Sequence, residues 1–386
     1  MSDLDKFRTP FVRVDYNILK RNIQNMQEFA NNHGIELHPM VKTHKSLEIA
    51  SIQMDAGAGG LTASKPKEAL VFVEANIAKT ITVTFPVVDP ESLFPLIKAA
   101  RYHGTDLRLV CDSEQGVEAA AEAAKLAEYK VKIFIKIDVG LHRCGLLPHD
   151  PKIIHLASAI EKNKALIFQG ILSHAGQCYG APNKEKVLCD AKEENEKMNS
   201  VKGILEKQGF NVPDLSVGAT PTLLAVENLP TIDKQKEYLA SVTEIRPGNY
   251  VFMDRTPLRL NLIDPAKQLA FTVIATVSSK NEWNVVIDAG SKFLTSETGA
   301  HGIEGMKGFG MAYPIDHFLE DNYKEFVKSL SEEHGKIEPN FKASLKERVV
   351  IVPNHSCTVC AVNKEIYLFD GDTFVKTISV SARSLF

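Results

Sequence analysis

The strongest constraint on the fold is a regular alternation of short strand-like segments with longer helical ones between about residues 17 and 255. The helical stretches are amphipathic, and the first ends on Gly34, a residue that favours the end of a helix. Eight strand-like segments, rich in β-branched residues, span 35–42, 59–64, 80–85, 106–112, 131–138, 166–175, 214–219 and 242–248. Eight strand–helix units over this length predict a (β/α)8 barrel, with a doubly wound α/β sheet as the competing fold.

After residue 256 the pattern changes to strand-like segments separated by turn residues. These segments span 271–279, 283–290, 348–354, 365–371 and 373–382, and one helix is predicted between them at 314–335. The sequence therefore predicts an α/β barrel over 14–255 and a second, mostly β domain made of 256–386 with the N-terminal residues 1–13.

Composition narrows the classes of partner. The 386 residues carry a formal net charge of -3 with both signs interspersed, so we expect neither nucleic-acid binding nor membrane binding. The start of the chain lacks a secretion signal, and no apolar run approaches the ~18 residues of a membrane span, which predicts a cytoplasmic enzyme of small molecules. In that compartment the six scattered cysteines are expected to be reduced.

Reactive side chains follow several predicted strands at the end where barrel enzymes place their chemistry. Lys42 ends the first strand, Arg143 follows the fifth, His174 and Tyr179 follow the sixth, and Gly/Thr-rich loops at 218–222 and 246–250 follow the last two. Taken singly, a lysine there is usually solvated and a Gly-Thr turn is usually only a turn. Together they describe a Schiff-base amine beside a cradle for one phosphate, which fits pyridoxal 5'-phosphate (PLP).

The segment PNHSCTVC at 353–360 is a second candidate site. If it forms a strand, His355 and Cys357 share one face while Cys360 points to the other. This arrangement argues against a four-ligand structural zinc site. A catalytic metal pair and a buried histidine with two inert thiols both remain open on these residues alone.

Nearly the whole chain resembles the family of D-threonine aldolases and eukaryotic-type D-serine dehydratases, which are PLP enzymes with an alanine-racemase-like fold. The resemblance rests on these motifs in this order: TPFVRVD, HPMVKTHK, DVGLHRCG, GILSHAG, GATPT, TEIRPGNYVFMD, VIDAGSK, LSEEHG and PNHSC. It implies a homodimer whose active site lies at the subunit interface.

The same resemblance assigns roles to residues. Lys42 matches the PLP lysine, with Lys45 as the alternative and otherwise a surface residue at a helix start. Arg143 matches the arginine that contacts the cofactor's phenolic oxygen, and His174 matches the imidazole that lies against its ring. Arg246 matches the residue facing the pyridine nitrogen, with Glu244 as the alternative. The remaining cofactor-binding residues implied are Tyr179, Gly218, Thr220, Thr222, Gly248, Asn249 and Tyr250.

In this family the C-terminal motif is HxD in the D-threonine aldolases, which use a hard divalent ion such as manganese, and HxC in the D-serine dehydratases, which use zinc. His355 and Cys357 give the HxC form, and a thiolate softens a site toward zinc, with manganese or magnesium as alternatives. Two protein ligands leave coordination positions open, which is the catalytic pattern. Glu333 and His334 of SEEHG either cap the predicted helix or support this site.

The function implied is a PLP- and zinc-dependent lyase of the D-serine dehydratase type, which eliminates water from a β-hydroxy D-amino acid to give a keto acid and ammonia. A metal-dependent D-threonine aldolase, giving glycine and an aldehyde, is the alternative. An amino-acid racemase and a non-catalytic PLP-binding protein rank below both. The sequence does not decide which β-hydroxy D-amino acid is the substrate.

Overall fold

The computed structural model describes residues 3–300 and 306–385. The chain divides into two compact units. The barrel unit comprises 25–42, 49–248 and 385–386, and the β unit comprises 1–24, 43–48 and 249–384. All six cysteines are free thiols.

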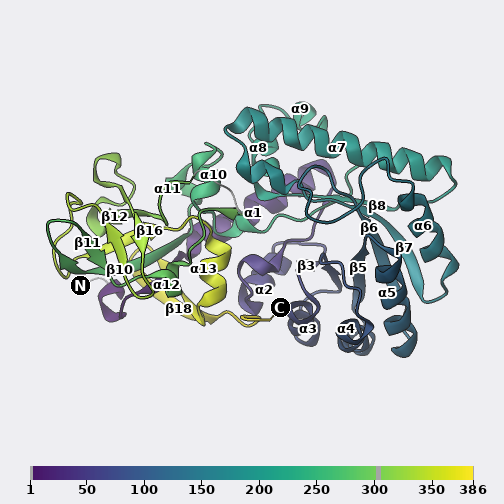
Figure 1. The fold of residues 1–386 in the computed structure, drawn as a ribbon, viewed down its shortest axis with the longest axis horizontal. Coiled ribbons are helices and arrows are strands. Elements are labelled where there is room, and N and C mark those ends of the chain that lie inside the picture. The colour runs from purple at the N-terminus through teal and green to yellow at the C-terminus, as the bar shows by residue number, and fades with distance from the viewer. Residues whose placement is uncertain (1–2, 301–305, 386) are drawn as a thin grey trace. The chain divides into compact units, whose positions relative to one another are not determined.

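The barrel unit is built on a parallel sheet (Figure 1). The strand order in this sheet is β2-β9-β8-β7-β6-β5-β4-β3. A parallel bridge between Met40 and Thr62 connects the chain after β2 to β3, at the other end of this order. Each of the eight predicted strands is present, which confirms the barrel and rules out the doubly wound alternative. The strands are β2 (Glu36–Leu37), β3 (Leu61–Ala63), β4 (Thr80–Val83), β5 (Asp106–Cys111), β6 (Val131–Lys136), β7 (Leu166–Leu172), β8 (Asp214–Val217) and β9 (Glu244–Ile245).

Helices follow the strands and cover the outside of this sheet (Figure 1). Their ends carry the expected signals: Asp89 caps the start of α4 by accepting from the backbone N–H groups of Glu91 and Ser92, and Gly104 ends it with φ 69°. The helices are α2 (Leu47–Asp55), α3 (Pro66–Glu74), α4 (Pro90–His103), α5 (Glu114–Leu126), α6 (Lys152–Lys162), α7 (Lys184–Lys207), α8 (Thr220–Glu227) and α9 (Ile232–Lys236). The sheet and its helices thus bring the carboxyl ends of all eight strands to one rim.

The β unit contains a mixed sheet in the order β13-β12-β16-β10-β1-β17-β18, extended by β11, β15 and β14. Its strand β1 lies between β10 and β17 and comes from the N-terminus, so the two ends of the chain share one core. The strands are β1 (Phe11–Asp15), β10 (Phe271–Lys280), β11 (Val285–Ile287), β12 (Met311–Pro314), β13 (Glu325–Phe326), β14 (Ser329–Leu330), β15 (Gly335–Ile337), β16 (Arg348–Val352), β17 (Glu365–Asp370) and β18 (Thr373–Ser379).

Helices are few and short in this unit. The long α1 (Tyr16–His33) begins in the β unit and ends in the barrel unit. The other helices are α10 (Arg255–Arg259), α11 (Pro265–Gln268), α12 (Ser291–Leu294) and α13 (Ser356–Val362). The unit is therefore mostly β, as predicted; the domain boundary at residue 255 stays a prediction.

The helix predicted at 314–335 is wrong. The segment instead contains two short 3-10 turns, Ile315–His317 and Asp321–Tyr323, followed by β13 and β14. Leu319 adopts φ 69°, which interrupts any helix there, and β13 pairs with β12. The pairing of strands in the tertiary structure therefore prevails over the helical spacing of apolar residues.

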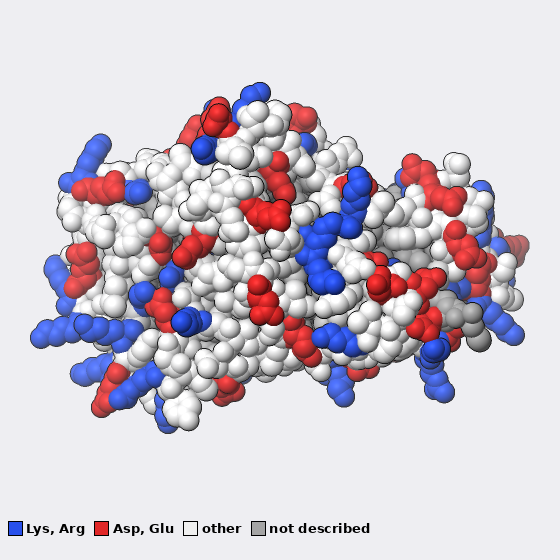
Figure 2. Space-filling view, turned by 180° about the vertical axis from the view of Figure 1, so that it is seen from behind, with Lys and Arg blue, Asp and Glu red and all other residues white. Residues whose placement is uncertain are grey.

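None of the helices in the described part of the chain is long and apolar enough to cross a lipid bilayer. On the face of the molecule seen in Figure 2, Lys and Arg side chains are interspersed with Asp and Glu. This distribution matches the mixed charge pattern of the sequence.

Candidate active site

A cavity of about 450 Å³ opens at the carboxyl ends of four neighbouring strands of the barrel unit. Its lining residues follow β3, β4, β5 and β6 or end them, together with Lys42 from the segment after β2. They are Lys42, Ser64, Thr84, Phe85, Pro86, Asp112, Lys136, Arg143 and Cys144. The structure therefore brings the predicted Lys42 and Arg143 together at the predicted rim.

Lys42 lies in a 3-10 turn (Val41–Thr43), because β2 is shorter than the strand predicted at 35–42. The turn is held by the bridge from Met40 to Thr62, and the Thr62 hydroxyl donates to the carbonyl of His38 at 2.8 Å. The alternative lysine is not the surface residue expected from the sequence. Lys45 is 5% exposed, and its amine lies 3.4 Å from the carbonyl oxygen of Ala382, within the β unit.

Lys136 is a residue of this cavity that sequence reasoning missed. It ends β6, its Nζ donates to the carbonyl of Thr84 at 2.9 Å, and it hydrogen-bonds Cys144. Burial lowers the pKa of Lys136 to about 8. The sequence pattern that could have predicted it is a lysine near the end of the apolar strand VKIFIKID, since barrel enzymes place their reactive groups at the carboxyl ends of strands.

The residues predicted to form a phosphate cradle lie where β8 meets α8. Gly218 has φ 138°, and a Cβ there would stand 2.9 Å from the backbone nitrogen of Arg246, so no other residue fits. The Thr220 hydroxyl at the start of α8 is buried without a hydrogen-bond partner among the described residues. The Thr222 hydroxyl donates to the carbonyl of Ala219 at 2.9 Å. An orphaned hydroxyl at a helix N-terminus suits a phosphate, so these residues fit PLP.

His174 follows β7, and its Nδ1 lies 2.8 Å from the carbonyl oxygen of Gly218. A carbonyl only accepts, so Nδ1 carries a proton, and in the neutral imidazole Nε2 is then the acceptor. His174 also lines a second, small cavity with Lys136 and Arg143, and its ring centroid lies 6.5 Å from that of Tyr179. The structure thus places the predicted imidazole beside the predicted guanidinium.

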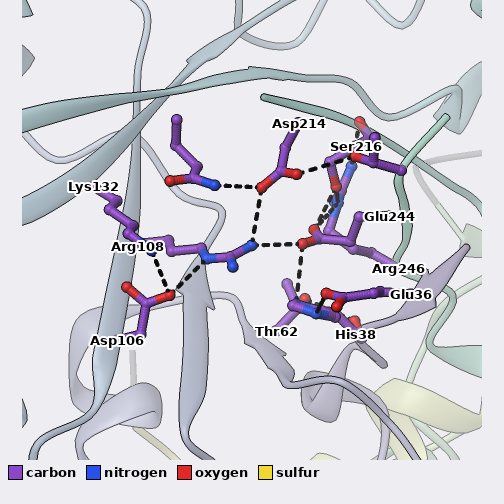
Figure 3. A network of polar contacts seen from close by, with 12 residues as sticks. Glu36, His38, Thr62, Asp106, Arg108, Lys132, Asp214, Ser216, Glu244 and Arg246 are labelled. Atoms are coloured by element: carbon purple, nitrogen blue, oxygen red, sulfur yellow. Dashed lines mark hydrogen bonds and ion pairs between the residues drawn. The ribbon is translucent and has the colours of Figure 1, made fainter. Parts of the chain in front are cut away.

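Glu244 and Arg246 lie in a buried polar network inside the barrel (Figure 3). Glu244 Oε1 accepts from the Ser216 hydroxyl at 2.5 Å, and its Oε2 lies 3.0 Å from Arg108 Nη1. Arg246 Nε donates to Ser216 Oγ at 2.6 Å, and its Nη2 donates to the carbonyl of Ser173 at the end of β7. Burial lowers the pKa of Arg246, while the carboxylates of Glu244 and Glu194 oppose that shift.

The last three predicted cofactor residues lie where the barrel unit passes into the β unit. Gly248 ends the barrel unit, and buried Asn249 and Tyr250 begin a 3-10 turn (Asn249–Val251) in the β unit. Asn249 Nδ2 donates to Asp254 Oδ2 at 2.5 Å.

The segment PNHSCTVC is not a strand, which corrects the sequence prediction. Strand β16 ends at Val352 because Pro353 has no N–H group to continue the ladder, and His355 becomes the N-cap residue of helix α13. His355 and Cys357 nevertheless remain together, because their side chains hydrogen-bond each other. Glu297, which sequence reasoning missed, lies 2.5 Å from Nδ1 of His355.

This pair has the chemistry of two metal ligands with an outer carboxylate. Burial alone would lower the pKa of His355, but Cys357, Glu297 and Asp254 together raise it well above its usual value. Cys357 also contacts the hydroxyl of Thr43 at 3.3 Å. Within residues 3–300 and 306–385, no group of three or more His, Cys, Asp or Glu residues is arranged to hold a metal ion.

Two further expectations about this region change. Cys360 is fully buried as predicted, but the reason is the helix, on which its thiol lies 3.4 Å from the carbonyl oxygen of His44. Glu333 and His334 do not cap a helix, since they occupy the turn between β14 and β15. The exposed Glu333 pairs with Lys292 at 2.8 Å.

Comparisons with known proteins agree with this fold. The model of the alanine racemase N-terminal domain matches residues 14–256, and a serine dehydratase domain matches 270–369. D-threo-3-hydroxyaspartate dehydratase from Delftia sp. (strain HT23) is 28% identical over 96% of both chains. Its solved structure has a TM-score of 0.85 and covers 98% of each chain.

Other relatives span a similar length. D-serine dehydratase from Dictyostelium discoideum is 27% identical over 96% of this chain and 95% of that one. D-threonine aldolase from Arthrobacter sp. is 27% identical over 97% of this chain and 90% of that one.

An eight-stranded parallel barrel with a second, mostly β unit matches the alanine-racemase-like fold. The chain belongs to the family of the alanine racemase N-terminal domain. The resemblance to D-serine dehydratases and D-threonine aldolases inferred from the sequence is confirmed.

Proposed function

We propose that the protein is a PLP-dependent lyase that eliminates water from a β-hydroxy D-amino acid. The observation that carries this proposal is the convergence of Lys42 and Arg143 on one cavity of about 450 Å³ at the barrel rim. The full-length similarity to D-threo-3-hydroxyaspartate and D-serine dehydratases supports the reaction class.

Each of the proposed site residues has a separate role in binding the cofactor or in moving a proton. PLP, when bound, supplies an electron sink that acidifies the α C–H bond of an amino acid. The Lys42 amine holds the cofactor and takes the α-proton, Arg143 binds its phenolic oxygen, and His174 packs on its ring. Gly218, Thr220 and Thr222 bind its phosphate, and the proposed cofactor set is completed by Tyr179, Arg246, Gly248, Asn249 and Tyr250.

His355 and Cys357 are the proposed ligands of a zinc ion, with manganese or magnesium as the alternative metal. The metal would supply charge stabilisation to a leaving hydroxide, which is a poor leaving group. One solved form of D-threo-3-hydroxyaspartate dehydratase is a Cys-to-Ala variant in the metal-free form, and a His-to-Ala variant changes a residue two positions earlier. His355 and Cys357 have the same spacing.

Assembly and location follow the family expectation. We propose a homodimer with the active site at the subunit interface, working in the cytoplasm. An active, monodisperse monomer in solution would contradict the assembly.

Product analysis tests the reaction. The holoenzyme is incubated separately with D-serine, D-threonine and 3-hydroxy-D-aspartate. Ammonia with a keto acid is expected. Glycine with an aldehyde would instead establish aldol cleavage, which the D-threonine aldolase relative makes the second candidate. Racemisation, or PLP binding without turnover of any of these substrates, would overturn the lyase assignment.

A further inference from the structure

Glu194 of helix α7 is a buried carboxylate to which the proposed chemistry assigns no role. It is 3% exposed, although the helix it belongs to is otherwise rich in solvated charges. Burial raises the pKa of Glu194, whereas the Ser173 hydroxyl and the charge of Arg246 act against that rise. A buried carboxylate needs hydrogen-bond donors around it, because an unpaired buried charge is strongly destabilising.

Its partners are the ends of two strands at the cofactor rim. Glu194 Oε1 accepts from the Ser173 hydroxyl at 2.7 Å and from the backbone N–H of Ala175 at 3.1 Å. The carboxylate also accepts from the backbone N–H of Gly218. Ser173 and Ala175 flank His174, and Gly218 starts the phosphate cradle.

These contacts hold the residues on both sides of His174 and also Gly218, which accepts a hydrogen bond from the imidazole. His174 Nδ1 donates to the carbonyl of Gly218 at 2.8 Å, while Glu194 holds the N–H of the same glycine and both neighbours of His174. The position of the imidazole, and the neutral tautomer in which Nε2 is the acceptor, therefore depend on residues that Glu194 holds by hydrogen bonds. Arg246 joins this assembly through the carbonyl of Ser173.

We infer that Glu194 is a positioning residue that holds His174 and the phosphate cradle in register, so that PLP binds in a single orientation. The inference rests on the proposed function, since it concerns the same cofactor. Glu194 itself reaches neither PLP nor the substrate; it acts through the strand ends that carry the residues proposed to bind the cofactor.

Asp190 supplies a matched control. It lies one helical turn before Glu194 on the same helix, it is 2% exposed, and its carboxylate pairs with Lys186 at 2.7 Å. Substituting Asp190 removes a buried carboxylate from α7 but keeps the hydrogen bonds that Glu194 accepts from the residues that follow β7 and β8. A general loss of helix packing would affect both positions alike.

The experiment compares Glu194→Gln, Ser173→Ala and Asp190→Asn with the wild-type full-length holoenzyme. PLP is achiral, so its circular dichroism in the visible region reports how firmly the protein fixes its ring. In Glu194→Gln one acceptor oxygen becomes an amide NH2 donor, so the side chain offers fewer acceptor positions to the Ser173 hydroxyl and to the backbone N–H groups of Ala175 and Gly218. We expect about tenfold weaker PLP binding and a smaller visible dichroism per bound cofactor.

Ser173→Ala removes only one donor and should shift both readouts less, in the same direction. Asp190→Asn should lower the melting temperature while leaving both readouts at wild-type values. Wild-type affinity and dichroism in Glu194→Gln would overturn the inference, as would equal losses in Asp190→Asn. If Glu194→Gln does not fold, unchanged readouts in Ser173→Ala overturn it. A wild-type chain that binds no PLP would instead refute the proposed function itself.

Discussion

Arg246 Nε lies 3.8 Å from Oε1 of Glu244, and both side chains are 2% exposed. Strand alternation predicts that these residues share a face, and the structure agrees. Glu244 is committed to Ser216 and Arg108, whereas the guanidinium reaches the carbonyl of Ser173 at the end of β7. This difference supports Arg246, and not Glu244, as the residue proposed to face the pyridine nitrogen.

Glu244→Gln should destabilise the protein by about 3 kcal/mol, because two buried arginines would lose their shared carboxylate. Denaturation by urea measures this loss. Glu36→Gln is the control: its carboxylate lies 3.0 Å from His38 in the same network but is 65% exposed, so about 1 kcal/mol or less is expected. A cost for Glu244→Gln no greater than that of the control would contradict the importance of the buried network.

The lowered pKa of Lys136 predicts that the stability of the protein depends on pH. The ordinary pKa of 10.5 applies to the unfolded chain, and burial lowers the pKa to about 8 in the folded protein. Between these values the unfolded chain binds more protons, so this group makes the free energy of unfolding rise with pH across that window. The contribution is about 3 kcal/mol, an order-of-magnitude value.

Lys136→Met should therefore flatten the rise in unfolding free energy between pH 8 and pH 10.5. Lys132→Met on the same strand is the control for loss of a lysine. If the two variants show the same pH profile, the buried amine of Lys136 does not titrate as described.

Lys42 should be the residue that borohydride reduction labels with a pyridoxyl group, and the purified protein should be yellow. Peptide mapping locates the label. Because the amine of Lys45 lies against the carbonyl of Ala382 in the β unit, Lys45 should remain unlabelled. A label on Lys45 or Lys136, or no label, would refute the assignment of Lys42.

Much of the barrel was predictable because its eight strands are dense in β-branched residues and recur at regular spacing. The rim residues Lys42 and Arg143 followed from that register, since a strand's carboxyl end fixes where the next side chain lies. Lys136 was missed because a lysine within a strand is usually solvated, and only the packing of β6 reveals its burial.

The β unit was less predictable because distant segments decide its local structure. The stretch 314–335 has the apolar spacing of a helix, but its pairing with β12 and β15 exists only in the folded chain. Likewise Glu297 precedes His355 by more than fifty residues, so no local sequence pattern predicts their contact. Glu194 of α7, in the barrel unit, was also missed: α7 is rich in charged residues, and the partners that bury this carboxylate are distant in the sequence.

Asp254→Asn tests how the β unit organises the segment that carries His355 and Cys357. The buried Asp254 carboxylate accepts from Asn249 Nδ2, from the backbone N–H of Ser356 at 3.0 Å and from that of Thr256 at 2.9 Å. An amide would oppose one of these donors, at a cost of about 2 kcal/mol. Zinc affinity, measured by competition with a chelator, should fall as well; unchanged affinity and stability would contradict this role.

Cys357 carries the sharpest test of the metal proposal. Chelation should abolish elimination while leaving the visible absorbance of bound PLP intact, because the metal serves the β-hydroxyl, and added zinc should restore turnover. Cys357→Ala should lose most zinc affinity and elimination together, whereas exchange of the α-proton with solvent should partly survive because it needs only Lys42 and the cofactor.

Cys357→Asp and Cys360→Ala complete this test of the metal pair. Cys357→Asp recreates the HxD form and replaces a soft ligand with a hard one, so metal preference should shift toward manganese and aldol cleavage should rise relative to elimination. Cys360→Ala should cost only about 1 kcal/mol of stability and leave zinc binding unchanged, because its thiol is buried against the carbonyl of His44. If Cys360→Ala damages zinc binding as much as Cys357→Ala does, or if the metal-free enzyme keeps full activity, the assignment of His355 and Cys357 as metal ligands is wrong.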